Sequence, residues 1–163
     1  MSYEHENALF VNRLNGGTLF VVNGVADGAD VGCVRYSTWD KNRRHRWTVR
    51  KVAEENGRDV MTIEVADGGK VFCVDAGDAK ISQGIPVKIR ERDGSDRQKW
   101  YFAPDPITDG KLINIWSYSN WSAALTLHTV DPEWDRVVLD RSFFSDSQLW
   151  YQDGSHYHDE IPD

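Results

Sequence analysis

Three tryptophans recur at nearly equal spacing along this 163-residue chain, and they limit the possible folds more than any other feature of the sequence. A polar residue precedes each of them by two positions, in His45-Arg46-Trp47, Gln98-Lys99-Trp100 and Gln148-Leu149-Trp150. A repeated unit of this length is too small to bury its own apolar face, so the units must share one core. We therefore interpret the tryptophans as core residues. Their polar partners are expected to fasten the preceding loop by hydrogen bonds, on strands where both side chains point the same way.

The residues before the tryptophans predict strands. Aligned without a gap, the three segments read VRYSTWDKNRRHRW, VKIRERDGSDRQKW and VVLDRSFFSDSQLW. The alignment matches Val34, Val87 and Val137, and an apolar or aromatic residue follows two positions after each valine. A period of two indicates a strand with one buried face.

Turn residues stand earlier in each unit and are followed by a short apolar run, which is the pattern of a hairpin. They are Asn15-Gly16-Gly17, Asp67-Gly68-Gly69 and Asn120-Trp121-Ser122. No segment shows a helical stripe, so we predict an all-β fold of three pseudo-symmetric four-stranded repeats, forming a barrel capped by hairpins. Closure removes the exposed edges that separate small sheets would carry.

We predict a single domain over residues 1–163, and the segments between its parts are expected to be solvated. The three repeats cover about residues 7–50, 60–103 and 112–152. A charged loop at 50–59 and a Pro-rich loop at 103–111 connect them, and a tail follows at 154–163.

Charge and composition exclude several classes of protein. The net charge of −7 argues against nucleic acid and anionic membrane surfaces as partners, because both require a basic patch. No run of 18 apolar residues predicts a membrane span. The first residues lack the basic and apolar segments of a secretory signal, so we expect a cytoplasmic protein, with leaderless secretion left open. Cys33 and Cys73 are too few for a disulfide framework; we expect small buried hydrophobes, with pairing between them left open.

Sequence patterns for catalysis and for cofactors are missing. The chain contains no nucleophile elbow, no phosphate-binding glycine loop and no H-E-x-x-H pattern, so we predict neither an enzyme nor a cofactor. The tail places His156 and His158 beside Asp159. Without a ligand on a rigid element these residues do not make a metal site, and we predict none.

The repeated Q-x-W pattern resembles that of the ricin-B-type β-trefoil lectins, over about residues 7–152. The resemblance implies a β-trefoil that binds carbohydrate in shallow pockets, one on a repeat. In that family an aspartate accepts hydrogen bonds from two sugar hydroxyls. An aromatic ring three residues after the matching valine stacks on the sugar, and an asparagine before the Q-x-W glutamine completes the site. These groups suit a pyranose, which has polar hydroxyls and an apolar C–H face.

Repeat 2 retains the acid of this pattern. Asp75 takes the aspartate position, with Gln98 behind it, while Arg90 and Arg97 take the stacking and asparagine positions. Asp75 either accepts sugar hydroxyls or caps the DAGDAK turn by hydrogen bonds to its own backbone.

Repeat 1 departs further from the family. Asn23 takes the aspartate position, Ser37 the stacking position and Arg44 the asparagine position. Trp39 stands two residues beyond Ser37, on the same face of a continuing strand. Trp39 either stacks on a sugar together with Asn23 or folds over the barrel rim.

Repeat 3 carries His128 in the aspartate position, Asp140 in the stacking position and Ser147 in the asparagine position. Trp134 lies close by in the DPEWD loop. His128 is either a sugar ligand or an ordinary surface histidine, and Trp134 is either a binding platform or a filler of the hairpin cap.

The predicted function is that of a carbohydrate-binding lectin with one to three shallow sites and with glycans or glycoproteins as partners. A homodimer is possible and would supply avidity. The alternative is a protein-interaction module or protease inhibitor that uses its loops, because one fold hosts many functions.

Overall fold

The computed structural model describes residues 4–14, 16–34, 46–77, 85–106, 108, 111–119, 123–128, 135–142 and 145–153. These residues form β-strands joined by turns, with no α-helix among them. The strands are β1 (Glu4–Asn12), β2 (Thr18–Val21), β3 (Val31–Val34), β4 (Trp47–Glu55), β5 (Arg58–Asp67), β6 (Lys70–Asp75), β7 (Ile85–Pro86), β8 (Lys88–Glu91), β9 (Trp100–Pro104), β10 (Ile113–Ser117), β11 (Ala123–His128), β12 (Asp135–Arg141) and β13 (Trp150–Asp153). Within this described part, no helix is long and apolar enough to cross a membrane.

A closed ring of antiparallel strands forms the barrel, with two strands from each repeat. Around the ring the order is β1, β4, β5, β9, β10 and β13, and β13 pairs with β1 again. Closure leaves none of these strands with an unpaired edge. The three buried tryptophans begin β4, β9 and β13, so the last strand of every repeat brings an indole into the core.

Three hairpins, β2–β3, β6–β8 and β11–β12, complete the repeats. They meet around a pseudo-threefold axis, where the backbone N–H of Val31 donates to the carbonyl of Val87, and the N–H of Val87 donates to the carbonyl of Val137, each at 3.1 Å. The side chains of all three valines are buried. The predicted all-β fold of three four-stranded repeats, a barrel capped by hairpins, is therefore confirmed, and this is the β-trefoil arrangement.

The predicted register of repeat 1 is wrong by three residues. The gap-free alignment placed Val34 with Val87 and Val137, but Val31 is the residue that hydrogen-bonds to Val87 on the axis. Val31 stands sixteen positions before its tryptophan, whereas Val87 and Val137 stand thirteen positions before theirs. Repeat 1 therefore carries three additional residues between its hairpin and Trp47. Two valines three positions apart hide such an insertion from an ungapped alignment.

The structural role predicted for the three tryptophans is confirmed. Each is almost completely buried, and each indole N–H donates to the backbone carbonyl of an apolar residue in the first strand of its hairpin. These bonds join Trp47 to Leu19 (3.1 Å), Trp100 to Val74 (2.9 Å) and Trp150 to Leu125 (3.1 Å). An indole N–H that is buried needs such a partner, and here the same partner position recurs three times.

The glutamines before Trp100 and Trp150 anchor their loops as predicted, but from a different backbone conformation. Gln98 and Gln148 end the short 3₁₀ turns η2 (Asp96–Gln98) and η3 (Asp146–Gln148) and are not on strands. Their side-chain amides donate to the carbonyls of Glu91 (3.0 Å) and Arg141 (2.7 Å), at the ends of β8 and β12. His45 lies outside the described residues.

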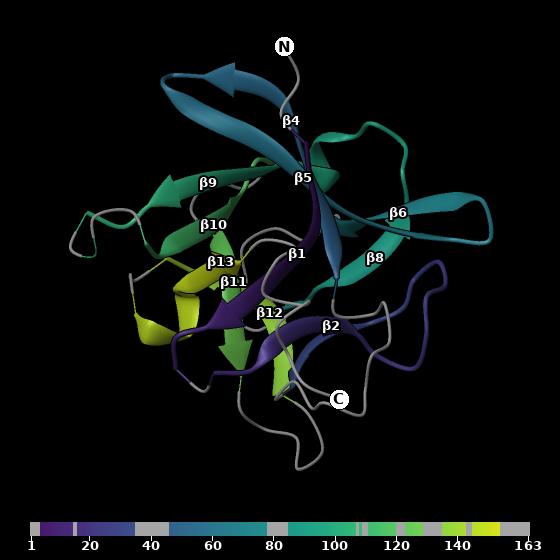
Figure 1. Ribbon diagram of the computed structural model, residues 1–163, viewed down its shortest axis with the longest axis horizontal. Coiled ribbons are helices and arrows are strands. Elements are labelled where there is room, and N and C mark those ends of the chain that lie inside the picture. The colour runs from purple at the N-terminus through teal and green to yellow at the C-terminus, as the bar shows by residue number, and fades with distance from the viewer. Residues whose placement is uncertain are drawn as a thin grey trace.

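The prediction of a solvated loop over residues 50–59 is wrong. This segment is the hairpin of β4 and β5, which projects at the top of Figure 1, above β9 and β10. Its turn is Asn56-Gly57, with φ values of 56° and 75°, and Asn-Gly is the preferred pair for a two-residue hairpin turn. The charges that suggested a loop lie on the exposed part of these strands, where Lys51 pairs with Glu54 (2.9 Å) and Asp59 (3.0 Å).

Both cysteines are buried and neither forms a disulfide, which confirms the interpretation of small buried hydrophobes. Burial raises the pKa of the Cys73 thiol to about 12, because a thiolate would be poorly solvated there. Cys73 is therefore protonated and packed as an apolar residue over the ordinary range of pH.

Candidate functional site

The recurring tryptophan bonds define which positions are equivalent in the three repeats. The residue after each carbonyl acceptor is Phe20 in repeat 1, Asp75 in repeat 2 and Thr126 in repeat 3. Asp75 is the acid of this set. The position at which the family resemblance expects an aspartate thus carries a carboxylate in repeat 2 alone.

Asp75 ends β6 and is held by two hydrogen bonds. Its Oδ1 accepts from the backbone N–H of Gly77 at 2.7 Å, and its Oδ2 accepts from Nε2 of Gln98 at 3.1 Å. Gly77 has a φ of 73°, which turns the chain so that its N–H faces back to Asp75. The carboxylate therefore caps the turn, as one of the two sequence interpretations expected. Its side chain is only 1% exposed.

Gln98 has a defined orientation because both ends of its amide are engaged. Its Oε1 accepts from the backbone N–H of Asp93 at 3.0 Å, so its Nε2 is directed to Asp75 and to the Glu91 carbonyl. Asp93 is itself bonded to Ser95, whose hydrogen bonds lower the pKa of the Asp93 carboxyl. The structure thus brings the predicted pair Asp75 and Gln98 together, and the backbone N–H of Asp93 orients the Gln98 amide.

Two arginines stand at the positions where the family places an aromatic ring and an asparagine. The Nε atom of Arg97 lies 4.0 Å from Oδ1 of Asp75, and its Nη2 atom lies 3.5 Å from Oδ2 of Asp93. Arg90 is exposed on β8, opposite Cys73. The guanidinium of Arg97 therefore lies beside Asp75, at the position where the family pattern expects an asparagine.

The predicted equivalence of His128 with Asp75 is wrong, because Thr126 holds that position. Thr126 Oγ1 accepts from Nε2 of Gln148 at 3.1 Å, which matches the bond between Gln98 and Asp75. His128 lies two residues further on, exposed at the end of β11 and opposite Arg136. A role for His128 in sugar binding stays a prediction, and Trp134 lies outside the described residues.

The predicted equivalence of Asn23 with Asp75 is also wrong. Phe20, which is buried, takes the position in repeat 1, and Asn23 lies three residues later in the exposed turn after β2. Its φ of 62° is tolerated by asparagine and suits a turn. Trp39, its expected partner, lies outside the described residues, so the pairing of Asn23 with Trp39 stays a prediction.

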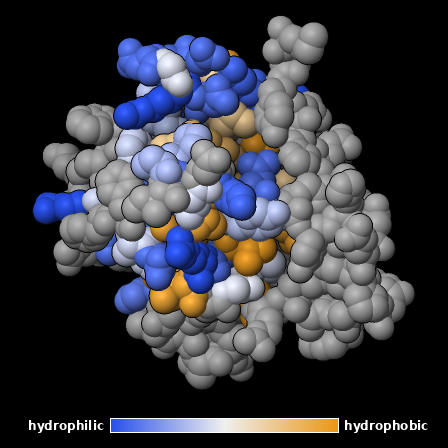
Figure 2. Space-filling model, turned by 60° about the vertical axis from the view of Figure 1, so that its left-hand side comes forward, coloured by the Kyte–Doolittle hydropathy of each residue, from blue (hydrophilic) through white to orange (hydrophobic). Residues whose placement is uncertain are grey.

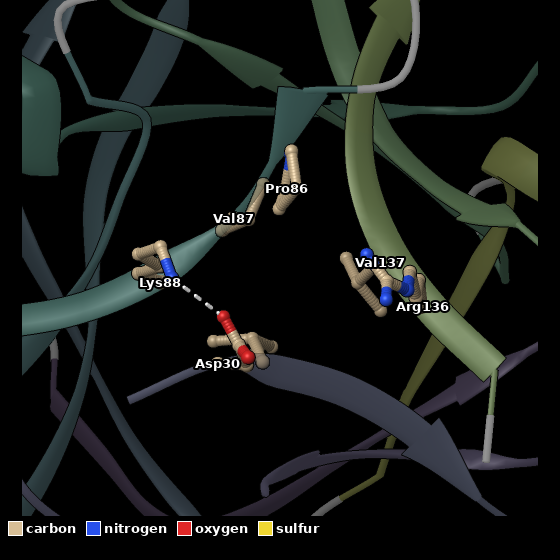
Figure 3. Close-up of a pocket in the computed structure, with 7 residues that line it drawn as sticks. Asp30, Pro86, Val87, Lys88, Arg136 and Val137 are labelled. Atoms are coloured by element: carbon tan, nitrogen blue, oxygen red, sulfur yellow. Dashed lines mark hydrogen bonds and ion pairs between the residues drawn. The ribbon is translucent and has the colours of Figure 1, made fainter. Parts of the chain in front are cut away.

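Sequence reasoning missed a small hollow on the pseudo-threefold axis (Figure 3). It is lined by Asp30, Val31, Pro86, Val87, Lys88, Arg136 and Val137, which come from all three repeats. Lys88 donates to Asp30 at 2.7 Å across repeats. The hollow measures about 150 Å³, well below the roughly 300–1,000 Å³ typical of ligand pockets. The correct valine register would have located these residues, since each adjoins an axial valine.

Metal binding gains no support from the described residues. Among them, no group of three or more His, Cys, Asp or Glu side chains is arranged to hold a metal ion. The tail residues His156, His158 and Asp159 lie outside the described part of the chain.

Comparison with known proteins gives matches among solved structures. No protein-family model and no curated protein matches the sequence. A designed threefold symmetric protein, ThreeFoil, is 22% identical with a TM-score of 0.71, over 89% of this chain and 96% of that one. A lectin of Polyporus squamosus, bound to a human-type influenza-binding epitope, is 17% identical with a TM-score of 0.70, over 93% of this chain and 50% of that one.

An agglutinin of Rhizoctonia solani is 14% identical with a TM-score of 0.67, over 92% of this chain and 96% of that one. The chain thus spans nearly all of the designed protein and of the agglutinin, and half of the Polyporus lectin chain. Likeness at such low identity establishes the fold and leaves the ligand open. By its strand pairing and by these structural matches, this chain is a β-trefoil protein.

Proposed function

We propose that this protein binds carbohydrate, with its principal site at Asp75 and Gln98 in repeat 2. The observation that carries the proposal is the Asp75 carboxylate, which the Gln98 amide and the Gly77 N–H hold in one orientation. The β-trefoil neighbours that are a lectin and an agglutinin support the same class of function.

The chemistry of this site suits sugar hydroxyls. An ionised carboxylate has about four acceptor positions, and the described contacts occupy one on each oxygen of Asp75. Hydrogen bonds from two hydroxyls to such a group are charge-assisted and therefore strong. Because the side chain is buried, a sugar that reaches its oxygens would have to displace the groups packed against it; the guanidinium of Arg97 lies 4.0 Å away. Arg97 would then donate to other sugar oxygens.

Further sites are proposed in the other repeats, at Asn23 with Trp39 and at His128 with Trp134. Neither set holds a carboxylate at the position of Asp75, so we expect repeat 2 to dominate. A single shallow site binds weakly, and a homodimer would raise the effective affinity by avidity.

A glycan array on the wild-type protein and on two matched variants tests the proposal. Asp75→Asn keeps the shape of the side chain and removes its charge. Thr126→Val disturbs the equivalent bond to Gln148 in repeat 3 and serves as the control. We expect Asp75→Asn to lose binding by about tenfold or more, from the strength of hydrogen bonds to a charged acceptor, and Thr126→Val to bind normally. Unchanged binding by a folded Asp75→Asn variant would contradict the site.

The burial of Asp75 favours a second candidate function. A carboxylate that is 1% exposed and already caps a turn is fully explained as a structural group. The scaffold would then act through its loops, as a protein-interaction module or protease inhibitor. Inhibition of serine or cysteine proteases, combined with a silent glycan array, would establish this function and exclude carbohydrate binding.

A further inference from the structure

A second and larger hollow lies at the tip of the β4–β5 hairpin. It measures about 340 Å³ and is lined by Glu55, Asn56, Arg58 and Tyr101. The hairpin stands at the top of Figure 1, whereas β6 and β8, which carry the repeat 2 site, lie on the right. In Figure 2 hydrophilic residues gather at the top of the molecule, above a paler and partly hydrophobic band. The hollow shares no residue with the Asp75 site.

The aromatic residues beside this hollow are held in place. Tyr101 lies on β9, and Tyr118 follows β10; their ring centroids are 5.2 Å apart at an interplanar angle of 37°. The hydroxyl of Tyr118 donates to Oε2 of Glu55 at 2.7 Å. This bond raises the pKa of Tyr118 to about 12, so the phenol remains a donor at ordinary pH. The hairpin tip is thus tied to β9 and β10, and Glu55 and Tyr101 keep a defined relation.

Arg58 and Asn56 complete the lining with side-chain donors that the fold does not use. The guanidinium carbon of Arg58 lies 4.8 Å from the centre of the Trp116 ring, which is a cation–π contact. Neither Arg58 nor Asn56 makes a side-chain hydrogen bond or ion pair in the part of the chain that the structure describes. Both residues are exposed, so their donors face solvent.

The combination of groups defines a class of ligand. Tyr101 offers an aromatic surface, Glu55 a charged acceptor, Asn56 an amide and Arg58 a planar set of donors. One carboxylate and one guanidinium give the lining no net charge, which favours a neutral ligand over an anion. The volume lies within the range of small-molecule pockets. A neutral pyranose has the matching chemistry, with several hydroxyls on its edge and an apolar C–H face.

We propose that the tip of the β4–β5 hairpin binds a neutral pyranose, with its C–H face on Tyr101, its hydroxyls donating to Glu55, and its oxygens accepting from Asn56 and Arg58. The site is independent of Asp75 and does not rest on the function proposed for repeat 2.

Two-dimensional ¹H–¹⁵N NMR titrations test this site, with the methyl glycosides of galactose, glucose and mannose as probes and glucuronate as the charged comparison. Backbone shifts are expected at residues 55–58, 101 and 116–118, in response to at least one neutral glycoside. Tyr101→Ala and Arg58→Ala should each weaken this binding by about tenfold or more, as expected when a stacking or charged contact is lost.

Controls separate binding from the stability of the hairpin. Glu54→Gln changes an exposed charge on the same hairpin and should bind as the wild type does. Asp75→Asn should leave the shifts at the tip unchanged, so the two sites succeed or fail separately. The proposal is overturned if no neutral glycoside shifts the tip residues, if only glucuronate does, or if a folded Arg58→Ala variant binds normally.

Discussion

Repeats 2 and 3 share one loop anchor but attach it to different chemical groups. In both repeats a glutamine at the end of a 3₁₀ turn donates to the last carbonyls of the hairpin, at Glu91 or Arg141. The second acceptor of Gln98 is the carboxylate of Asp75, whereas that of Gln148 is the hydroxyl of Thr126. The glutamine that anchors the loop is common to the two repeats, whereas its second side-chain acceptor differs between them.

This difference teaches that the glutamine anchors belong to the scaffold and leave the ligand undetermined. The glutamine is buried and bonded in both repeats, so its presence is explained without a sugar. Ligand chemistry depends on the acceptor position, and there the repeats carry a phenylalanine, an aspartate and a threonine. Two equal anchors therefore do not predict two equal binding sites.

The largest effects should be the same in both repeats. Trp100→Ala and Trp150→Ala should each lower the free energy of unfolding by about 3–5 kcal/mol, because each leaves a large cavity and an unpaired carbonyl. Denaturant unfolding followed by far-UV circular dichroism measures this loss. Tyr151→Ala, at a neighbouring aromatic that is 44% exposed, is the control and should cost about 0.5 kcal/mol or less. A nearly neutral effect at either tryptophan would break the equivalence of the repeats.

Intermediate effects should distinguish the repeats. Gln98→Ala is expected to cost about 2–3 kcal/mol, because it leaves the buried carboxylate of Asp75 short of a donor. Gln148→Ala should cost about 1–2 kcal/mol, since it leaves the neutral hydroxyl of Thr126 without this donor. The same unfolding measurement applies. Because the cost at Gln98 depends on its partner, a double variant with Asp75→Ala should be less destabilised than the sum of the single changes. Strict additivity would show that the pair does not interact.

The smallest effect concerns Cys73, whose equivalent in repeat 3 is Ala124, one residue before the tryptophan's carbonyl acceptor. Both positions are completely buried. Cys73→Ala replaces one buried apolar group by a slightly smaller one, so we expect a loss of about 1 kcal/mol at pH 7. A loss as large as that of a tryptophan variant would show that repeat 2 depends on this thiol in a way that repeat 3 does not.

The pH dependence of stability adds a second measurement on the same variant. Folding raises the pKa of Cys73 from 9.0 to about 12, so the folded state retains a proton that the unfolded state has lost between these values. The free energy of unfolding should therefore fall as pH rises above about 9. Cys73→Ala should make this fall shallower. Tyr118, whose pKa is raised from 10.0 to about 12, contributes a fall of the same sign, which Tyr118→Phe isolates.

Much of the fold could be predicted because local chemistry repeats along the chain. The spacing of Trp47, Trp100 and Trp150 requires three units, and the alternation of apolar residues requires strands with one buried face. The Asn-Gly pair at 56 and 57 is typical of a hairpin turn, although the charged residues around it favoured the prediction of a loop. These features depend on neighbours within a few residues, and for that reason they can be read from the order of the amino acids.

The tertiary structure decided which residues are equivalent and which meet. Val31, and not Val34, lies on the axis because backbone bonds between distant repeats select it. Asp75 has Phe20 and Thr126 as its counterparts because the tryptophan bonds, and not the distance along the chain, set the register. Glu55 and Arg58 meet Tyr101 because strand pairing brings β9 beside β5. The amino-acid order determined the repeating scaffold. Contacts between residues far apart in the chain decided which residues form its sites. An insertion changes the spacing along the chain, but the strand pairing that brings residues together stays the same.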